Sequence, residues 1–299
     1  MPEWQERLTR DTKPSIRAEH DLRYGAAAPL IASAPVWVDL GCGAGVAASD
    51  AIGDRFGGHA VLIDVSQDAL DEAAATVHAG TIGCVRADLA DEQDVARVRQ
   101  AAIDAGRDGC VTCFEVIEHL VTFVPVLELL VELATEHGYT VVLSVPNDAF
   151  WALENPFHQT MWGEGAFEEL RRLLPADHVV ARQVPLTGSA IVVDDEATEL
   201  AVPAVTVGSD RVPSHFIAAF GPRAREVVPR AFATAADLDG QRTWERQREA
   251  QLAFHEAELA HLRAYVADHK RRTTRRRLRA PGDDAADGAA EEPTPAEQA

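Results

Sequence analysis

Cysteine is scarce in this chain, whose 299 residues include only four, at positions 42, 84, 110 and 113. Four cysteines cannot supply the disulfide framework of a small secreted domain, so we expect free thiols in a reducing compartment. Long hydrophobic runs are also missing, because no window of about 18 residues is both apolar and uncharged. The first 14 residues lack the apolar core of a signal peptide. These absences predict a soluble, cytoplasmic protein without a membrane span.

Positive charge is in short supply. The chain has 28 Lys and Arg residues against 48 Asp and Glu residues, which gives a formal net charge of -20. Such a surface repels phosphate backbones and anionic lipid headgroups, which argues against nucleic-acid binding by the main body. Residues 269–279 depart from this balance, since they hold seven Lys and Arg residues and no acid. They predict either docking on an anionic membrane or RNA, or a solvated helix end where cations are favoured.

Short runs rich in Val and Ile alternate with helix-like stretches between residues 35 and 220. This pattern is typical of strands buried on both faces with helices between them. Seven strands are expected, at Val36–Leu40, Ala60–Asp64, Gly83–Arg86, Cys110–Glu115, Thr140–Val145, Val179–Pro185 and Ser214–Phe220. No helical pattern separates the last two, which predicts an antiparallel pair at the sheet edge. The expected fold is α/β, a Rossmann-like, doubly wound seven-stranded sheet that is mostly parallel with an antiparallel edge strand.

The segment after residue 222 has a different pattern. Residues 241–270 contain no Gly or Pro, which predicts one long C-terminal helix. Leu252, Leu259 and Val266 recur at intervals of seven, so this helix either packs on its own domain or forms the seam of a homodimer. The predicted organisation is an N-terminal helical segment, a main domain, a helical extension with a basic end, and a disordered acidic tail, at residues 1–28, 29–222, 223–280 and 281–299.

The strongest local signal is a buried strand that ends in Asp39 and is followed by a glycine cluster. Gly41, Gly43 and Gly45 alternate directly after this acid. Glycines allow positive φ and let a ligand approach the backbone closely. A dinucleotide-binding loop would have the spacing G-x-G-x-x-G, whereas the spacing here is G-x-G-x-G. The neighbouring acid argues against a pyrophosphate and for a ligand that bears a cationic amino group.

This stretch resembles the first motif of the class I S-adenosylmethionine-dependent methyltransferases. In that family an acid ending the second strand holds the ribose hydroxyls, and a side chain after the third strand meets the adenine amino group. Asp64 and Asp88 match these two positions. Val65 and Leu89 beside them, with Cys42 in the glycine loop, complete this part of the predicted cofactor site. The resemblance implies S-adenosylmethionine as cofactor, bound at the carboxyl ends of the strands as in other open α/β sheets.

Further stretches narrow the resemblance. Residues 19–24, 155–158 and 167–170 are similar to the subgroup that includes ubiquinone-type O-methyltransferases and many methyltransferases of sugar and glycan pathways. The resemblance covers about residues 17–222. It implies that Arg23 and Tyr24 cover the methionine end of the cofactor, although such a pair is equally typical of a surface helix.

Glu115, Glu118, His119 and His158 form the candidate catalytic set. Small-RNA 2'-O-methyltransferases are similar here, with the spacing Glu-x-x-Glu-His and a later His, and they hold Mg²⁺ with these side chains. The resemblance implies a Mg²⁺ site at all four residues that lowers the pKa of an acceptor hydroxyl. A second interpretation assigns Glu115 to the cofactor and His119 to general base catalysis without a metal. A third gives the set a purely structural role.

The residues after the fourth strand narrow the choice of acceptor atom. Methyltransferases that act on adenine or glutamine amides usually carry Asn/Asp-Pro-Pro-Phe/Tyr there, whereas this chain has Glu-Val-Ile-Glu at residues 115–118. A hydroxyl needs a base or a metal to lose its proton, which fits the Glu and His set. We therefore predict O-methylation of a sugar, glycan or other small polyhydroxylated metabolite. The alternatives are an RNA 2'-O-methyltransferase and a non-catalytic cofactor-binding scaffold.

Overall fold

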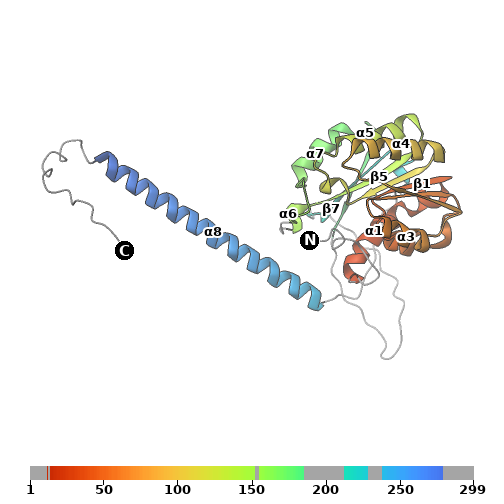
Figure 1. Cartoon of the computed structure of the whole chain (residues 1–299). Helices are drawn as coiled ribbons and strands as arrows, with labels where there is room; N and C mark the ends of the chain where they lie inside the picture. Colours follow the sequence, from red (N-terminus) through yellow and green to blue (C-terminus); the bar gives the residue numbers. More distant parts are fainter. Residues whose placement is uncertain (1–11, 13, 152–154, 185–211, 228–237, 279–299) are drawn as a thin grey trace, which may run out of the picture. The chain divides into compact units, whose positions relative to one another are not determined.

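The computed structural model describes residues 12, 14–151, 155–184, 212–227 and 238–278 (Figure 1). The chain divides into two compact units, Met1–Leu238 and Asp239–Ala299. The predicted acidic tail at 281–299 lies outside the described residues, as do the first 11 residues of the predicted N-terminal segment.

The first unit is built around a seven-stranded sheet with the order β3-β2-β1-β4-β5-β7-β6. The strands are β1 (Val36–Leu40), β2 (His59–Asp64), β3 (Thr81–Arg86), β4 (Cys110–Phe114), β5 (Thr140–Pro146), β6 (Val179–Gln183) and β7 (His215–Phe220). The first five pair in parallel, β7 runs antiparallel to β5, and β6 pairs antiparallel with β7 at the edge. All seven predicted strands are therefore confirmed, together with the antiparallel pair.

The central strands are buried on both faces, as their apolar composition predicts. Every residue of β1, β4 and β5 is buried. Successive side chains of a strand point to opposite faces, so Val38 and Leu40 belong to one apolar core and Trp37 belongs to the other. Each face therefore needs its own layer of helices to exclude water.

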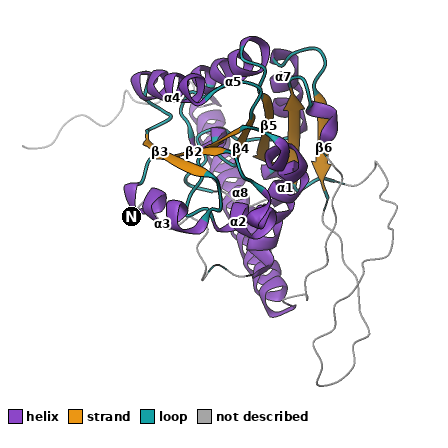
Figure 2. Ribbon diagram, turned by 90° about the vertical axis from the view of Figure 1, so that its right-hand side faces the viewer, coloured by secondary structure: helices purple, strands orange, loops and turns teal. Residues whose placement is uncertain are grey.

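Helices supply both layers. They are α1 (Pro14–Ser33), α2 (Val46–Ile52), α3 (Gln67–Thr76), α4 (Glu92–Ala105), α5 (Val124–Glu136), α6 (Asp148–Trp151) and α7 (Glu164–Leu173), with short 3-10 turns at Gly53–Arg55, Ile117–His119 and Ala224–Glu226. Apolar side chains of α1, α2 and α3 enter one core, and those of α4, α5 and α7 enter the other. Figure 2 shows these two layers on either side of the sheet. The predicted doubly wound α/β fold is confirmed.

The helices after β2 and β3 begin at side-chain caps. Ser66 Oγ accepts from the Ala69 amide at the start of α3, and Asp91 Oδ1 accepts from the amides of Gln93 and Asp94 at the start of α4. Such caps satisfy amides that have no partner within the helix. They fix where each strand-to-helix loop ends, and these loops carry the predicted cofactor residues.

The second unit contains α8 (Leu238–Leu278), a helix of 41 residues that confirms the predicted C-terminal helix. The side chains of the basic segment 269–279 lie outside the described residues. Among the helices that the structure describes, none combines the length and the apolar character that crossing a bilayer requires.

Candidate active site

The predicted site residues gather at one edge of the sheet. Because β1 to β5 are parallel, their carboxyl ends meet at this edge, and the strand order reverses between β1 and β4. Ligands of open α/β sheets bind in the crevice outside such an edge, at the point of reversal. The glycine loop follows β1, Asp64 ends β2, and Asp88 and Glu115 follow β3 and β4.

The glycine loop after β1 adopts a backbone conformation that favours glycine. Gly41, Gly43 and Gly45 have φ values of +73°, +53° and +70°. A Cβ atom on Gly41 would lie 2.4 Å from Val116 Cγ2, so there is no room for a side chain at this position. The Gly41 amide donates to the Ile63 carbonyl at 2.8 Å. The loop is therefore held between β2 and the segment after β4.

We expect Gly41→Ala to lower the free energy of unfolding by about 2–4 kcal/mol, because alanine is strained at this φ and would overpack Val116. Gly43→Ala is the matched control, since its φ is also positive but no atom lies within 4 Å of the added Cβ. It should cost only about 1–2 kcal/mol. Urea unfolding measures both losses, and equal values would contradict the steric assignment at Gly41.

Asp39 in β1 is fully buried and satisfied by two hydroxyl groups. Tyr24 Oη donates to its carboxylate, at 2.9 Å from Oδ2 and 3.1 Å from Oδ1, and Thr112 Oγ1 donates to Oδ1 at 2.6 Å. Burial raises the pKa of Asp39 to about 7, against the hydrogen bonds from Thr112 and Tyr24, which lower it. The structure thus joins two predicted cofactor residues, Tyr24 and Asp39, through a direct contact between α1 and β1.

The raised pKa of Asp39 makes stability depend on pH. This carboxyl has an ordinary pKa of 3.8 and a pKa of about 7 in the folded chain, so the folded state holds an extra proton between these values. Its contribution to stability is full below about pH 3.8 and is lost as the pH rises through about 7. In this window the folded chain binds about one proton more than the unfolded chain. We expect Asp39→Asn to remove this difference, so that the unfolding free energy of the variant depends less on pH. Denaturant unfolding at several pH values tests this, and parallel curves would contradict it.

Asp64 ends β2, and both of its carboxylate oxygens accept from backbone amides. Oδ2 accepts from Gly43 at 3.0 Å, and Oδ1 accepts from Ser66 at 2.9 Å. Asp88 after β3 is exposed, and its Oδ1 accepts from the Ala90 amide at 2.9 Å. Asp64 therefore connects the glycine loop to β2, while the Asp88 side chain lies at the surface of the same edge.

The three remaining predicted cofactor neighbours differ in exposure. Val65 is 44% exposed, whereas Leu89 and Cys42 are buried and belong to the two apolar cores. Of these three, only Val65 offers an open apolar surface at the ligand edge. Leu89 and Cys42 anchor the loops that carry Asp88 and Gly43.

Glu115 follows β4 with a φ of 55°, a left-handed conformation that is uncommon for a residue with a side chain. Ser144 Oγ donates to its Oε1 at 2.7 Å, and His215 Nε2 lies 3.3 Å from its Oε2. Burial alone would raise the pKa of Glu115, but the charges of Arg23 and His215 outweigh it and hold the pKa below its ordinary value. The side chain is therefore an anion held in place from β5 and β7.

Sequence reasoning missed the polar group around His215. His215 Nδ1 lies 3.7 Å from Glu19 Oε2, and Gln183 Nε2 donates to the same oxygen at 2.8 Å. Arg23 is buried and donates from Nη1 to Gln183 Oε1 at 3.0 Å, while its Nε and Nη2 have no hydrogen-bond partner among the described residues. Burial, and next the charge of Arg23, lower the pKa of His20 to about 3. The one signal in the sequence is that polar residues interrupt apolar strands at Gln183 and His215.

Glu118, His119 and His158 form a compact group whose ligand atoms all lie within 4.8 Å of one another. The two imidazole rings meet edge to face with their centroids 5.2 Å apart, and His119 Nε2 lies 4.0 Å from Glu118 Oε1. Glu118 is buried, and its Oε2 has no hydrogen-bond partner among the described residues. Burial, and next the charge of Glu115, raise the pKa of Glu118 well above its ordinary range. An uncompensated buried carboxylate beside two imidazoles is costly unless a cation or a proton joins it.

Glu115, the fourth predicted metal ligand, lies outside this group. Its carboxylate is held by Ser144 and His215 instead. Three of the four predicted ligands therefore converge, and Glu115 belongs to the network of α1, β5 and β7.

His158 is oriented by Asp148, a residue that sequence reasoning also missed. His158 Nδ1 lies 2.8 Å from Asp148 Oδ1, and the Trp162 amide donates to Asp148 Oδ2 at 2.5 Å. The Gln159 amide donates to the Glu118 carbonyl at 2.7 Å and ties this loop to the segment after β4. A carboxylate on one ring nitrogen fixes the tautomer and leaves Nε2 of His158 for a ligand.

A protein-family model described as a methyltransferase domain matches residues 16–182, which is more than half of the chain. The matched segment contains the five parallel strands, the glycine loop, and the group of Glu118, His119 and His158. A comparison with curated proteins finds no match.

Solved structures of methyltransferases are similar at low sequence identity. The small RNA methyltransferase HEN1 is 17% identical with a TM-score of 0.47 over 77% of this chain and 28% of that one, so this chain spans little more than a quarter of that protein. An S-adenosylmethionine-dependent methyltransferase from Archaeoglobus fulgidus is 16% identical with a TM-score of 0.45, over 68% of this chain and 93% of that one. Magnesium protoporphyrin IX methyltransferase from Synechocystis PCC 6803 is 14% identical with a TM-score of 0.41, over 73% and 88%.

Proposed function

The chain belongs to the family of methyltransferase domains, and from this premise we propose that it transfers the methyl group of S-adenosylmethionine to a hydroxyl of a sugar, glycan or small polyhydroxylated metabolite. The observation that carries the proposal is the group of Glu118, His119 and His158 at the ligand edge of the sheet. A hydroxyl must lose its proton to attack a methyl group, and a nearby imidazole supplies the base. A neutral amine already has the lone pair with which it attacks, so it does not need such a group.

We assign the cofactor to the loops after β1, β2 and β3. A Cβ atom on Gly43 would meet no atom within 4 Å, so this glycine leaves open space where the cofactor would lie. Asp64 suits the ribose hydroxyls, and the exposed Asp88 suits the adenine amino group. Arg23 suits the methionine carboxylate, because two of its buried guanidinium nitrogens have no partner among the described residues.

The residues present fit a divalent cation. The unpaired Oε2 of Glu118 and the imidazoles of His119 and His158 would hold it, with Asp148 supporting His158 from behind. The family resemblance implies Mg²⁺, while two nitrogen ligands are more typical of Mn²⁺, Fe²⁺ or Zn²⁺. When bound, such an ion polarises the acceptor hydroxyl and lowers its pKa.

The side chains of this group have separate tasks in the proposed transfer. The bond between sulfur and the methyl carbon breaks as the oxygen–carbon bond forms, and the hydroxyl proton leaves to a base. Without an ion, His119 is the proposed acceptor of this proton, because its side chain is 34% exposed, whereas that of His158 is 10% exposed and is held by Asp148. Glu118 Oε1 lies 4.0 Å from His119 Nε2, and an ionised Glu118 would stabilise the imidazolium that results. With an ion bound, His119 would be a ligand, and the acidified hydroxyl would lose its proton to solvent.

Methylation of an RNA 2'-hydroxyl is the second candidate, because the same three residues and the basic segment 269–279 would fit it. The net charge of -20 favours a small acceptor instead. RNA binding that falls steeply with salt and is lost on removal of residues 270–279 would favour the RNA candidate. We also propose that the basic segment 269–279 can contact an anionic membrane. The proposed compartment of the protein is the cytoplasm.

We expect labelled methyl groups from S-adenosylmethionine to enter the carbohydrate or small-molecule fraction of a cell extract, and EDTA to abolish the transfer. Readdition of Mg²⁺, Mn²⁺ or Zn²⁺ singly then identifies the ion. If the label still enters these fractions in the presence of EDTA, the transfer does not need a metal, and an imidazole is the base. Label in the RNA fraction would favour the second candidate, and cofactor binding without transfer to any fraction would identify a scaffold.

A further inference from the structure

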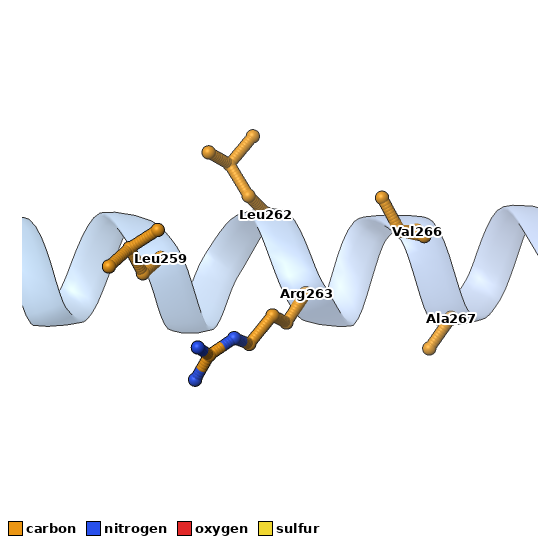
Figure 3. A pocket seen from close by; sticks show the side chains of 5 residues that line it. All are labelled: Leu259, Leu262, Arg263, Val266 and Ala267. Atoms are coloured by element: carbon orange, nitrogen blue, oxygen red, sulfur yellow. The ribbon is translucent and has the colours of Figure 1, made fainter.

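Apolar side chains lie exposed in a regular line along α8. Leu252, Leu259, Leu262 and Val266 are 48%, 51%, 55% and 48% exposed. Figure 3 shows three of them, Leu259, Leu262 and Val266, along one stretch of the helix. Most of the stability of a helix in a protein comes from burying its apolar face. These side chains therefore need a covering surface.

The spacing of these residues fits the seam of a coiled coil. Leu252, Leu259 and Val266 are seven residues apart and occupy one core position of the heptad, while His255 and Leu262 occupy the other. In a parallel pair of helices in register, each seam residue meets its own copy, so leucine packs on leucine. The apolar seam begins at Leu252, because Glu245 and Arg248 occupy the two core positions before it. His255 is the one polar core residue from Leu252 to Val266, and a single polar seam residue costs stability but fixes the register.

The charges beside the seam favour a second copy of the same helix. Residues 246–267 carry three arginines and three glutamates, so this stretch is neutral in a chain whose net charge is -20. In the parallel pairing, Glu258 of one helix faces Arg263 of the other, and the symmetry of the pair makes this contact twice. Gln251 faces Glu256 in the same way, so like charges do not meet at the positions that flank residues 252–266.

We propose that two copies of the chain associate through α8 as a parallel, in-register, two-stranded coiled coil centred on Leu259 and Leu262. The proposal is independent of the proposed methyl acceptor, because the site is built from α1 to α7 and the sheet. Such a dimer would contain two methyltransferase domains. Because the two helices are parallel, both basic segments 269–279 would lie at the same end of the coiled coil.

Sedimentation velocity of the full chain tests the proposal. The wild type should sediment as two chains and dissociate on dilution, and Leu259→Glu combined with Val266→Glu should raise the dissociation constant by more than about 100-fold. Phe254→Glu is the matched control, because Phe254 is 61% exposed but lies off the seam, and it should remain dimeric. Cofactor binding should be unchanged in all of these proteins, which separates this test from that of the proposed function.

Two further experiments test the pairing of Glu258 with Arg263 and the parallel direction of the two helices. Glu258→Arg and Arg263→Glu should each weaken the dimer by about tenfold, and their combination should restore it. Val266→Cys, in a chain where Cys84→Ser removes the exposed native thiol, should form an interchain disulfide under mild oxidation. A monomeric wild type, a dimer unaffected by the glutamate pair, or the absence of the cross-link would overturn the proposal. A lower unfolding temperature in the glutamate pair without a change in mass would show that the chain covers this face itself.

Discussion

Replacing His119 by alanine is expected to reduce methyl transfer by about 10²-fold or more while leaving the affinity for S-adenosylmethionine near that of the wild type. His119 lies in the group that includes Glu118 and His158, next to the edge assigned to the cofactor. A base that acts on the acceptor proton contributes in the transition state and not in cofactor binding, so turnover falls and cofactor affinity does not. Isothermal titration with the cofactor and initial rates of label transfer measure the two quantities separately.

His178→Ala is the matched control for this experiment. His178 is also a partly buried histidine, but its ring bonds to Arg171 and to the Pro175 carbonyl beyond the end of α7. This variant should keep wild-type turnover. If His119→Ala weakened cofactor binding and turnover equally, His119 would belong to the cofactor site. Partial rescue of His119→Ala by added imidazole would identify the lost function as that of a base.

Replacing Asp64 by alanine is expected to raise the dissociation constant of S-adenosylmethionine by about 10²- to 10⁴-fold. Hydrogen bonds that two ribose hydroxyls donate to a charged carboxylate are worth about 1.5–3 kcal/mol each. The same side chain accepts from the amides of Gly43 and Ser66, so its removal also loosens the glycine loop. Equilibrium titration with the cofactor is the direct measurement.

Asp64→Asn separates the two effects of this residue. The amide can still accept from the Gly43 backbone but offers the ribose one acceptor fewer, so we expect an intermediate loss of affinity of about tenfold. Asp68→Ala is the control, because Asp68 is an exposed acid in the first turn of α3. Its replacement should leave cofactor affinity unchanged. Wild-type affinity in Asp64→Ala would exclude this carboxylate from the cofactor site.

The amino-acid sequence by itself determined the sheet and the glycine loop after β1. Val- and Ile-rich runs such as Val36–Leu40 are buried on both faces, and this composition is typical of a central strand in a parallel sheet. The alternating glycines after Asp39 likewise reflect a local backbone requirement, because each has positive φ in the structure. Such features depend on neighbours within a few residues, so they can be predicted without knowing the rest of the fold. The sequence between the last two predicted strands has no helical pattern, and this local feature predicted their antiparallel pairing.

Only the tertiary structure decided which polar side chains meet. β7 runs antiparallel beside β5 with His215 opposite Pro146, and this register brings the imidazole to Glu115, 100 positions earlier in the chain. Ser144 and His215 hold the carboxylate of Glu115, which the sequence pattern had grouped with Glu118 and His158. Asp148 reaches His158 in a similar way, across a loop. Strand register and side-chain direction arise from packing between segments that are distant in the sequence. They therefore cannot be predicted from the local spacing of residues.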